Sequence, residues 1–336
     1  MIAFVGLDTS DVQRHRIVVV GGTHGNEYTG CYVIERLEKQ RKALRQAYPS
    51  LDIETLLANP RAYASNQRFL DDDLNRQFSL DRMADEPTSY EAVRAREIDA
   101  ALGPKGSEAA SEVCIDLHTT TANMGCTIIV NSYSSLALCA AAYLQAHWAD
   151  HCCANADGWS SVDGEHPHEH HPLRVYLHDV AQDAAPYLCS VSRAGITVEV
   201  GPTPQGLLRA DVVATSQRAV RLILRYLDLH YSGRAPEPPA RMPVYVDKGK
   251  VPWPIDTEGS TLPGALVAAS LQDRDFEPLE VGDPLFCMHD GSIVKYGGSN
   301  GAVVYPIFVN EAAYYYAQSG RGIGLTDRVD WPLTPP

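Results

Sequence analysis

A histidine and a glutamate stand three residues apart in the segment VVVGGTHGNEYTG, residues 18–30. His24 and Glu27 follow an apolar run and are surrounded by glycines, which allow the backbone to turn sharply. Imidazole nitrogens and carboxylate oxygens are common ligands of divalent metals such as zinc. A tight turn that points both side chains at one spot therefore predicts a metal site and not a plain surface loop.

A hydrolytic zinc site has three protein ligands and leaves a fourth position open. The best third candidate is His118, in the segment CIDLHTTT, because it also stands at the end of an apolar run. Asp116, two residues earlier, is expected to orient the ring of His118 from behind. The alternative is that each histidine is a hydrogen-bonded structural residue, and the pattern alone leaves that alternative open.

Two further features suggest hydrolytic chemistry. Glu199 is a charge inside the apolar run ITVEVGP, where an unpaired carboxylate would be costly. It is either buried beside an arginine or serves as a general base beside the metal. The loop RFLDDDLNR supplies Arg68 and Arg76, whose planar guanidinium groups match a carboxylate. A surface charge network is the alternative for that loop taken alone.

Short apolar runs alternate with longer amphipathic segments through roughly the first two thirds of the chain. This alternation favours an α/β layer with a mostly parallel sheet. In open α/β sheets, ligands bind at the carboxyl ends of the strands, where His24, His118 and Glu199 all fall. We expect strands at residues 16–20, 54–58, 113–117, 126–130 and 196–200, and helices at 30–48, 90–102, 136–148 and 211–231.

The composition changes at the proline-rich stretch SGRAPEPP, residues 232–239, which is typical of a linker. Short apolar runs and turn signals such as Gly282-Asp283-Pro284 follow it. We therefore expect two domains: residues 1–231 with the α/β layer, and residues 241–336 with a smaller, mainly β structure.

The composition also excludes some partners. The net charge of −14 argues against a nucleic-acid binder, which needs a basic surface. No apolar run is long enough to span a membrane. The eight cysteines form no CxxC pair, and the first residues lack a signal-peptide pattern, so we expect reduced thiols in a cytoplasmic protein.

The histidine-rich segment GEHPHEHH, residues 164–171, is a further metal-binding candidate. Small and polar residues surround it, and no strand is expected beside it to fix its side chains. We therefore interpret it as an exposed loop that binds metal adventitiously, not as a second functional site.

Six motifs occur in one order between residues 16 and 316: GGTHGNE, NPRA, DLNR, DLHTTTANMG, EVGPTPQGLLRAD and FVNEAAYY. Together they resemble the aspartoacylase family of zinc-dependent N-acyl-amino-acid hydrolases. The resemblance implies a zinc-carboxypeptidase-like α/β fold, with a mixed sheet flanked by helices. It also implies a smaller β-rich C-terminal domain that helps to cover the active site.

The resemblance implies catalytic roles for five residues. His24, Glu27 and His118 would bind one zinc ion per chain. Glu199 would act first as the general base and then as the general acid. Arg68 would polarise the scissile carbonyl and stabilise its developing oxyanion.

The resemblance also implies the substrate contacts. Asn75 and Arg76 would hold the α-carboxylate of the amino-acid half, and Tyr314 would reach the site from the C-terminal domain. Asp73 would support its neighbours without touching the substrate. The implied substrate is a small N-acyl-L-amino acid, with N-acetyl-L-aspartate as the first expectation, and the implied assembly is a homodimer.

The chain departs from animal aspartoacylases before Glu199. Those enzymes carry a tyrosine and then an arginine that grips the side-chain carboxylate of the substrate. Tyr187 would match the tyrosine, but Cys189 stands at the arginine position, and Arg193 or Arg174 would have to replace it. Deacylation of N-acetylated aromatic amino acids or mercapturates is therefore the main alternative. A zinc carboxypeptidase and a non-catalytic zinc-binding module are the others.

Overall fold

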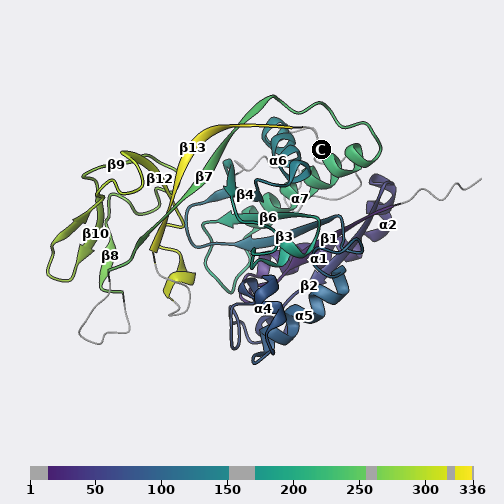
Figure 1. The fold of residues 1–336 in the computed structure, drawn as a ribbon, viewed down its shortest axis with the longest axis horizontal. Coiled ribbons are helices and arrows are strands. Elements are labelled where there is room, and N and C mark those ends of the chain that lie inside the picture. Colours follow the sequence, from purple (N-terminus) through teal and green to yellow (C-terminus); the bar gives the residue numbers. More distant parts are fainter. Residues whose placement is uncertain (1–13, 151–170, 255–262, 316–321, 335–336) are drawn as a thin grey trace, which may run out of the picture.

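The computed structural model describes residues 14–150, 171–254, 263–315 and 322–334. In these ranges a ten-stranded mixed sheet has the order β2-β1-β3-β6-β4-β5-β7-β13-β12-β9 (Figure 1). Its strands are β1 (His15–Gly21), β2 (Leu51–Leu57), β3 (Val113–Thr119), β4 (Gly125–Asn131), β5 (Leu173–His178), β6 (Ala194–Gly201), β7 (Arg241–Pro252), β9 (Leu279–Glu280), β12 (Val303–Ile307) and β13 (Gly322–Pro332). A three-stranded sheet has the order β11-β10-β8, with β8 (Ala265–Val267), β10 (Pro284–Met288) and β11 (Ile293–Lys295).

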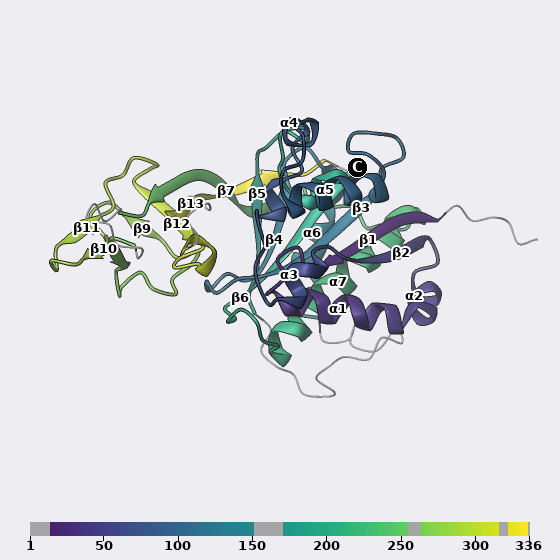
Figure 2. The ribbon, with the colours of Figure 1, turned by 90° about the horizontal axis from the view of Figure 1, so that it is seen from below.

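Helices cover both faces of the large sheet near its N-terminal strands. In Figure 2, α1 and α7 lie on one side of these strands, and α4 and α5 lie on the other. The helices are α1 (Tyr28–Lys39), α2 (Arg41–Ala47), α3 (Pro60–Ala64), α4 (Leu80–Ala84), α5 (Tyr90–Leu102), α6 (Ser135–His147) and α7 (Ala210–Tyr231). The described part of the chain also has three short 3-10 helices, η1 (Leu74–Arg76), η3 (Leu188–Val191) and η4 (Ala312–Tyr315).

Strand alternation sorts the side chains between two faces of the sheet. Along β6, Ile196 and Val198 enter the core formed with α1, α6 and α7. Because successive side chains point to opposite faces, Thr197 and Glu199 lie on the other face. His118 lies on that second face as well, since β3 runs parallel to β6 with His118 opposite Glu199. The candidate chemistry therefore shares one face of the sheet.

The C-terminal third is rich in β structure and remains joined to the large sheet. Strand β7 pairs with β5 in parallel, through Tyr176–Tyr245 and Leu177–Val246. The long antiparallel pair β7–β13 then continues out of the helix-flanked part into the β-rich part (Figure 1). That part has its own apolar core, which includes Trp253, Phe286 and Tyr296.

The expected fold class is confirmed: a mixed sheet is flanked by helices, and a β-rich domain follows it. The domain limits at residues 231 and 241 stay a prediction. They fall near the end of α7 at Tyr231 and the start of β7 at Arg241.

Two expectations about single elements were wrong, and one strand was missed. The helix expected at residues 30–48 is two helices, because Gln40 leaves the helical backbone region at φ −112° and ψ 14°. The strand expected at residues 54–58 begins earlier, since Leu51 already pairs with His15 of β1. Strand β5 was not expected at all, and it occupies a sheet position between β4 and β7.

Sequence analysis also led to expectations about the cysteines, the histidine-rich segment and membrane spans. Every cysteine in the described ranges is a free thiol, and all but Cys287 are buried. Cys152 and Cys153 lie outside the described residues, as does the histidine-rich segment except for His171. No helix in the described ranges has both the length and the apolar character needed to cross a membrane.

Gly21 permits the close contact between the end of β1 and the start of α1. A Cβ atom there would lie 2.4 Å from the carbonyl carbon of Gly30 and 2.8 Å from the nitrogen of Cys31. We expect Gly21→Ala to lower the free energy of unfolding by roughly 2–3 kcal/mol, because the backbone must shift to admit the methyl group. Urea unfolding followed by circular dichroism measures this loss.

Gly297→Ala is the matched control, because Gly297 is exposed and has open space around its Cβ position. We expect it to change stability by less than about 0.5 kcal/mol. Equal losses in the two variants would contradict the argument from close packing.

Candidate active site

Three predicted ligands converge at the carboxyl ends of β1 and β3. Glu27 lies between the two histidines: its Oε1 is 2.6 Å from Nδ1 of His24, and its Oε2 is 3.0 Å from Nδ1 of His118. The two Nδ1 atoms are 3.1 Å apart. All three side chains are buried, and their ligand atoms lie within 4.8 Å of one another. The turn and the strand end therefore present one compact group that could hold a metal ion.

A second carboxylate lies behind each histidine. Asp73 Oδ1 lies 3.1 Å from Nε2 of His24, and Asp116 Oδ2 lies 2.9 Å from Nε2 of His118. Thr23 donates a hydrogen bond to the other oxygen of Asp116 and so fixes that carboxylate. A carboxylate at Nε2 favours the tautomer with its proton there, which leaves the Nδ1 lone pair free for a metal.

The electrostatics of this group fit a bound cation. Burial would raise the pKa of Glu27, but His24 and His118 outweigh it and lower that pKa. Burial would likewise lower the pKa of His118, yet the carboxylates of Asp116 and Glu27 raise it well above its usual value. Both shifts show that this group favours positive charge beside the ionised carboxylate of Glu27, and a bound metal cation can supply that charge. Two histidines and one glutamate are also a donor set that zinc accepts.

Arg68 is the buried cation beside the ligand group. Its Nη1 donates to Glu27 Oε1 at 3.2 Å, and its Nη2 donates to Asp73 Oδ2 at 3.3 Å. Its Nε is buried and has no hydrogen-bond partner among the described residues. Asp73 thus supports both His24 and Arg68, as expected from the sequence.

Glu199 lies beside His118 and lines a cavity of about 460 Å³. Its removal from water raises the pKa of this carboxyl group to about 8; Glu27 and Glu311 act in the same direction, against the attraction of His118 and Arg68. A carboxyl group with a pKa near neutrality can both take and return a proton at physiological pH.

The four predicted substrate contacts line the same cavity. Asn75 accepts a hydrogen bond from the backbone N–H of Leu188 at 2.9 Å, which ties η1 to η3. The guanidinium carbon of Arg76 lies 5.5 Å from the centre of the Tyr187 ring. Tyr314 reaches the cavity from η4 in the β-rich part.

Neither Arg193 nor Arg174 replaces, at this cavity, the arginine that is absent at Cys189. Cys189 is buried there, with its sulfur 3.5 Å from Oγ1 of Thr197. Arg193 is exposed and donates to the carbonyl of Glu108. Arg174 lies over the ring of Phe276 at 4.9 Å and is not among the described residues that line the cavity. The hypothesis that either arginine replaces the absent one is not supported.

Sequence analysis missed Glu311. This buried carboxylate accepts hydrogen bonds from the backbone N–H of Thr121 at 2.8 Å and its hydroxyl at 2.9 Å, and also from the hydroxyl of Thr120. Its other oxygen accepts from the backbone N–H of Ala313 at 3.0 Å. Glu311 therefore joins the loop after β3 to the short helix that carries Tyr314. A charge among small apolar residues, as in FVNEAAYY, was the signal for it.

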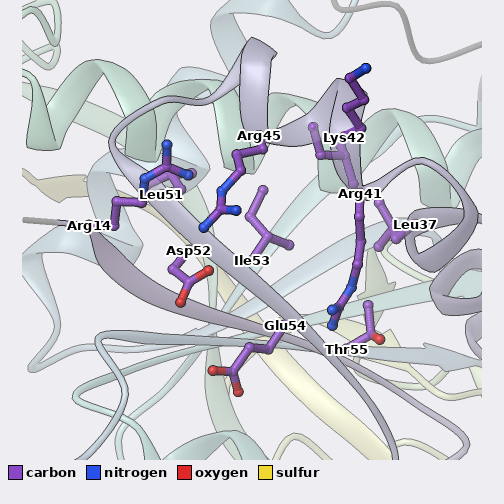
Figure 3. Close-up of a pocket in the computed structure, with 11 residues that line it drawn as sticks. Arg14, Leu37, Arg41, Lys42, Arg45, Leu51, Asp52, Ile53, Glu54 and Thr55 are labelled. Carbon is purple, nitrogen blue, oxygen red and sulfur yellow. The ribbon is translucent and has the colours of Figure 1, made fainter. Parts of the chain in front are cut away.

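A second cavity, of about 590 Å³, lies beside the edge strand β2 and helix α2. Figure 3 shows Arg41 and Arg45 extending from α2 toward the strand that carries Asp52 and Glu54. None of the predicted site residues lines it. The smaller cavity, which holds the ligand group and Glu199, is therefore the candidate active site.

Removing Glu311 tests whether it holds the two parts of the site together. We expect Glu311→Ala to lower the free energy of unfolding by about 3 kcal/mol, because several buried donors lose their acceptor. Thermal or urea unfolding measures the loss. Glu277→Ala is the matched control, since Glu277 is exposed and forms a surface ion pair with Arg274; a loss as small as that of the control would contradict this role.

Comparisons with known proteins agree with this arrangement. Residues 13–227 match the succinylglutamate desuccinylase/aspartoacylase catalytic domain, and residues 242–320 match the AstE/AspA barrel-sandwich hybrid domain. The N-acyl-aromatic-L-amino acid amidohydrolase (carboxylate-forming) of Homo sapiens is 37% identical over 325 residues, which are 96% of this chain and 92% of that relative.

Aspartoacylase from Rattus norvegicus is 35% identical over 303 residues, which are 89% of each chain. The crystal structure of murine aminoacylase 3 matches with a TM-score of 0.80 and 34% identity, over 97% of this chain and 100% of that one. The expected resemblance is confirmed, and the chain belongs to the succinylglutamate desuccinylase/aspartoacylase family.

Proposed function

We propose that this protein is a zinc-dependent amidohydrolase that cleaves N-acyl-L-amino acids into a carboxylate and the free amino acid. One observation carries the proposal: a His–Glu–His group, Glu199 and Arg68 meet at one cavity whose wall also holds Asn75 and Arg76. The names of the relatives, an amidohydrolase of N-acyl amino acids and an aspartoacylase, support the same reaction.

The ligand group is proposed to hold one zinc ion per chain, through His24, Glu27 and His118. The chemistry that zinc supplies when bound is Lewis acidity, which acidifies water and polarises a carbonyl oxygen. Asp73 and Asp116 hold the two imidazole rings so that their Nδ1 atoms face Glu27. Because the two rings are already held in this orientation, they need not reorient during the reaction.

Glu199 handles the proton in this proposal. Its carboxylate takes a proton from the water that attacks the acyl carbon, and then gives that proton to the departing nitrogen. The raised pKa supports the second step, because a weak carboxylic acid is readily ionised and reprotonated near pH 8. A positive charge near His118 would lower this pKa and favour the ionised base at the start of the cycle.

The arginines divide two charge-binding tasks between them. Arg68 lies against the ligand group, so its guanidinium is suited to the negative charge that develops on the acyl oxygen. Arg76 lies further along the wall, where Nη1 donates to the backbone carbonyl of Asn75 and holds the guanidinium in place. Arg76 and the amide nitrogen of Asn75 are the proposed anchor for the α-carboxylate.

N-acyl-L-amino acids with aromatic side chains are the favoured substrates. Recognition of N-acetyl-L-aspartate, the first expectation, needs a cation at the side-chain end, where Cys189 stands instead. The cavity wall carries the rings of Tyr176, His178 and Tyr187, and the His178 ring contacts each tyrosine ring edge to face. Hydrolysis of N-acetyl-L-aspartate to acetate and L-aspartate is the second candidate, because Lys250 also lines the cavity.

The cavity volume suits a small-molecule partner. The homodimer and the cytoplasmic location stay predictions from the sequence. Neither enters the mechanism, because the residues named for each step come from one chain.

Glu199→Gln tests the proposed base. We expect kcat to fall by roughly 10²- to 10⁴-fold, while the protein still binds one zinc ion per chain, because the amide cannot accept the proton. Release of acetate from N-acetyl-L-phenylalanine and metal analysis of the same sample give the two readouts. Exposed Glu277→Gln should retain normal turnover; near-normal turnover by Glu199→Gln would rule the assignment out.

Arg76→Ala tests the proposed carboxylate anchor. We expect KM to rise by roughly 10- to 100-fold with a smaller effect on kcat, because a charge-assisted hydrogen bond to the substrate is lost. Steady-state kinetics on the same substrate measure both parameters. Arg76→Lys should recover part of the affinity, and an unchanged KM in the alanine variant would move the carboxylate site elsewhere.

A further inference from the structure

Asn131 and His178 form a polar pair on the wall of the active-site cavity. They end the neighbouring parallel strands β4 and β5, where they are partners in register. Both side chains line the cavity. Each has a buried polar atom without a hydrogen-bond partner among the described residues: Oδ1 of Asn131 and Nδ1 of His178. The amide nitrogen of Asn131 is engaged, since it donates to the hydroxyl of Tyr133 at 3.3 Å.

The pair lies at the opposite end of the cavity from the ligand group. Strand β4 runs antiparallel to β6, and Thr127 is the partner of Glu199. Asn131 lies four residues beyond Thr127 on the same face, roughly 13 Å further along the strand. A substrate whose amide lies beside Glu199 therefore needs a long side chain to reach the pair.

Aromatic rings line the path to the pair. The ring of His178 lies 4.8 Å from that of Tyr176 and 5.3 Å from that of Tyr187, in edge-to-face contacts. The hydroxyl of Tyr176 donates to Asp247 at 3.2 Å and is engaged there. Such walls suit a flat aromatic side chain, which pairs with rings edge to face or offset.

The unpaired atoms of Asn131 and His178 specify which polar group the aromatic ring of the substrate must carry. Burial lowers the pKa of His178; Asp247 opposes this effect and Arg76 reinforces it, so the imidazole is neutral near pH 7. A neutral imidazole with its proton on Nδ1 donates one hydrogen bond, and Oδ1 of Asn131 accepts one. A hydroxyl group satisfies both atoms because it accepts and donates. A carboxylate only accepts, and a phenyl ring leaves both atoms unpaired.

We propose that Asn131 and His178 are specificity-determining residues that select N-acyl-L-amino acids with a hydroxyl-bearing aromatic side chain, represented by N-acetyl-L-tyrosine. The inference rests on the proposed function, which supplies the position of the amide in the cavity. A buried donor or acceptor left unpaired destabilises the complex, and a substrate hydroxyl pairs both atoms.

The test compares kcat/KM for N-acetyl-L-tyrosine and N-acetyl-L-phenylalanine with zinc-loaded enzyme. We expect the wild type to favour the tyrosine substrate by roughly 10- to 100-fold. His178→Phe keeps the ring and removes its nitrogens, and Asn131→Leu keeps the approximate volume; each should bring the ratio close to 1. His178→Asn places a polar atom at the δ position and should restore part of the preference.

His230→Phe is the matched control, because His230 lies on α7, packed on the rings of Tyr226 and Tyr231, and does not line the cavity. It should keep the wild-type ratio. A wild-type ratio near 1, or a ratio unchanged in both His178→Phe and Asn131→Leu, overturns the inference. If one of these variants does not fold, the other decides the outcome.

Failure of the proposed function has a different signature, because no N-acetyl amino acid would then release acetate. In that case, calorimetric titration of zinc-loaded Glu199→Gln with each ligand still tests the pair. Tighter binding of N-acetyl-L-tyrosine by at least tenfold supports the selection of a hydroxyl group, and equal dissociation constants overturn it.

Discussion

The buried carboxylate of Glu27 is the constraint on which the rest of the site depends. A charge so far from water is tolerated only when other groups compensate it. His24 and His118 face its two oxygens, Arg68 donates to one of them, and the backbone N–H of Thr119 donates to the other at 3.0 Å. These partners come from the turn after β1, the end of β3 and the loop before η1, so the charge can be compensated only when all three segments are in place.

Further carboxylates extend this network into the β-rich part. Glu311 holds the loop after β3 from one side. Asp275 holds it from another, since it accepts hydrogen bonds from the backbone N–H groups of Asn123 at 3.1 Å and Val309 at 2.9 Å. The segment that follows His118 is therefore fixed by residues far away in the sequence. Docking of the β-rich part and the shape of the metal-ligand group are coupled through these two side chains.

The sequence predicted those features that depend on local pattern. Strand ends, glycines and a charge in an apolar run made His24, His118 and Glu199 candidates, and the structure brings the three together, because parallel strands bring their carboxyl ends to one edge. The alternation of β3 also makes Asp116 and His118 neighbours on one face, which explains why the predicted support for the ring was right. Each of these inferences needs only the chain within a few residues of the side chain concerned.

Features that depend on distant partners escaped prediction. Glu311 and its threonine partners are separated by 190 residues or more, so no local pattern reveals their contact. Arg174 and Arg193 stand on either side of Cys189 in the sequence, but only the folded backbone decides that Arg174 lies over Phe276 and that Arg193 donates to Glu108. The strand expected at residues 126–130 stopped one residue before Asn131, and β5 was not expected. The part of the cavity wall that Asn131 and β5 form together could therefore not be predicted.

The reversal of strand direction between β6 and β4 separates two tasks within one cavity. The parallel strands β1, β3 and β6 bring the ligand group and Glu199 to one end of a sheet face. The antiparallel step to β4 sends the end of that strand, and of its parallel neighbour β5, toward the other end. Side chains there can change without disturbing the compensated charge at Glu27, because they share no hydrogen bond with it. On the proposed function, this geometry lets a family keep one hydrolytic centre while the far wall adapts to different side chains.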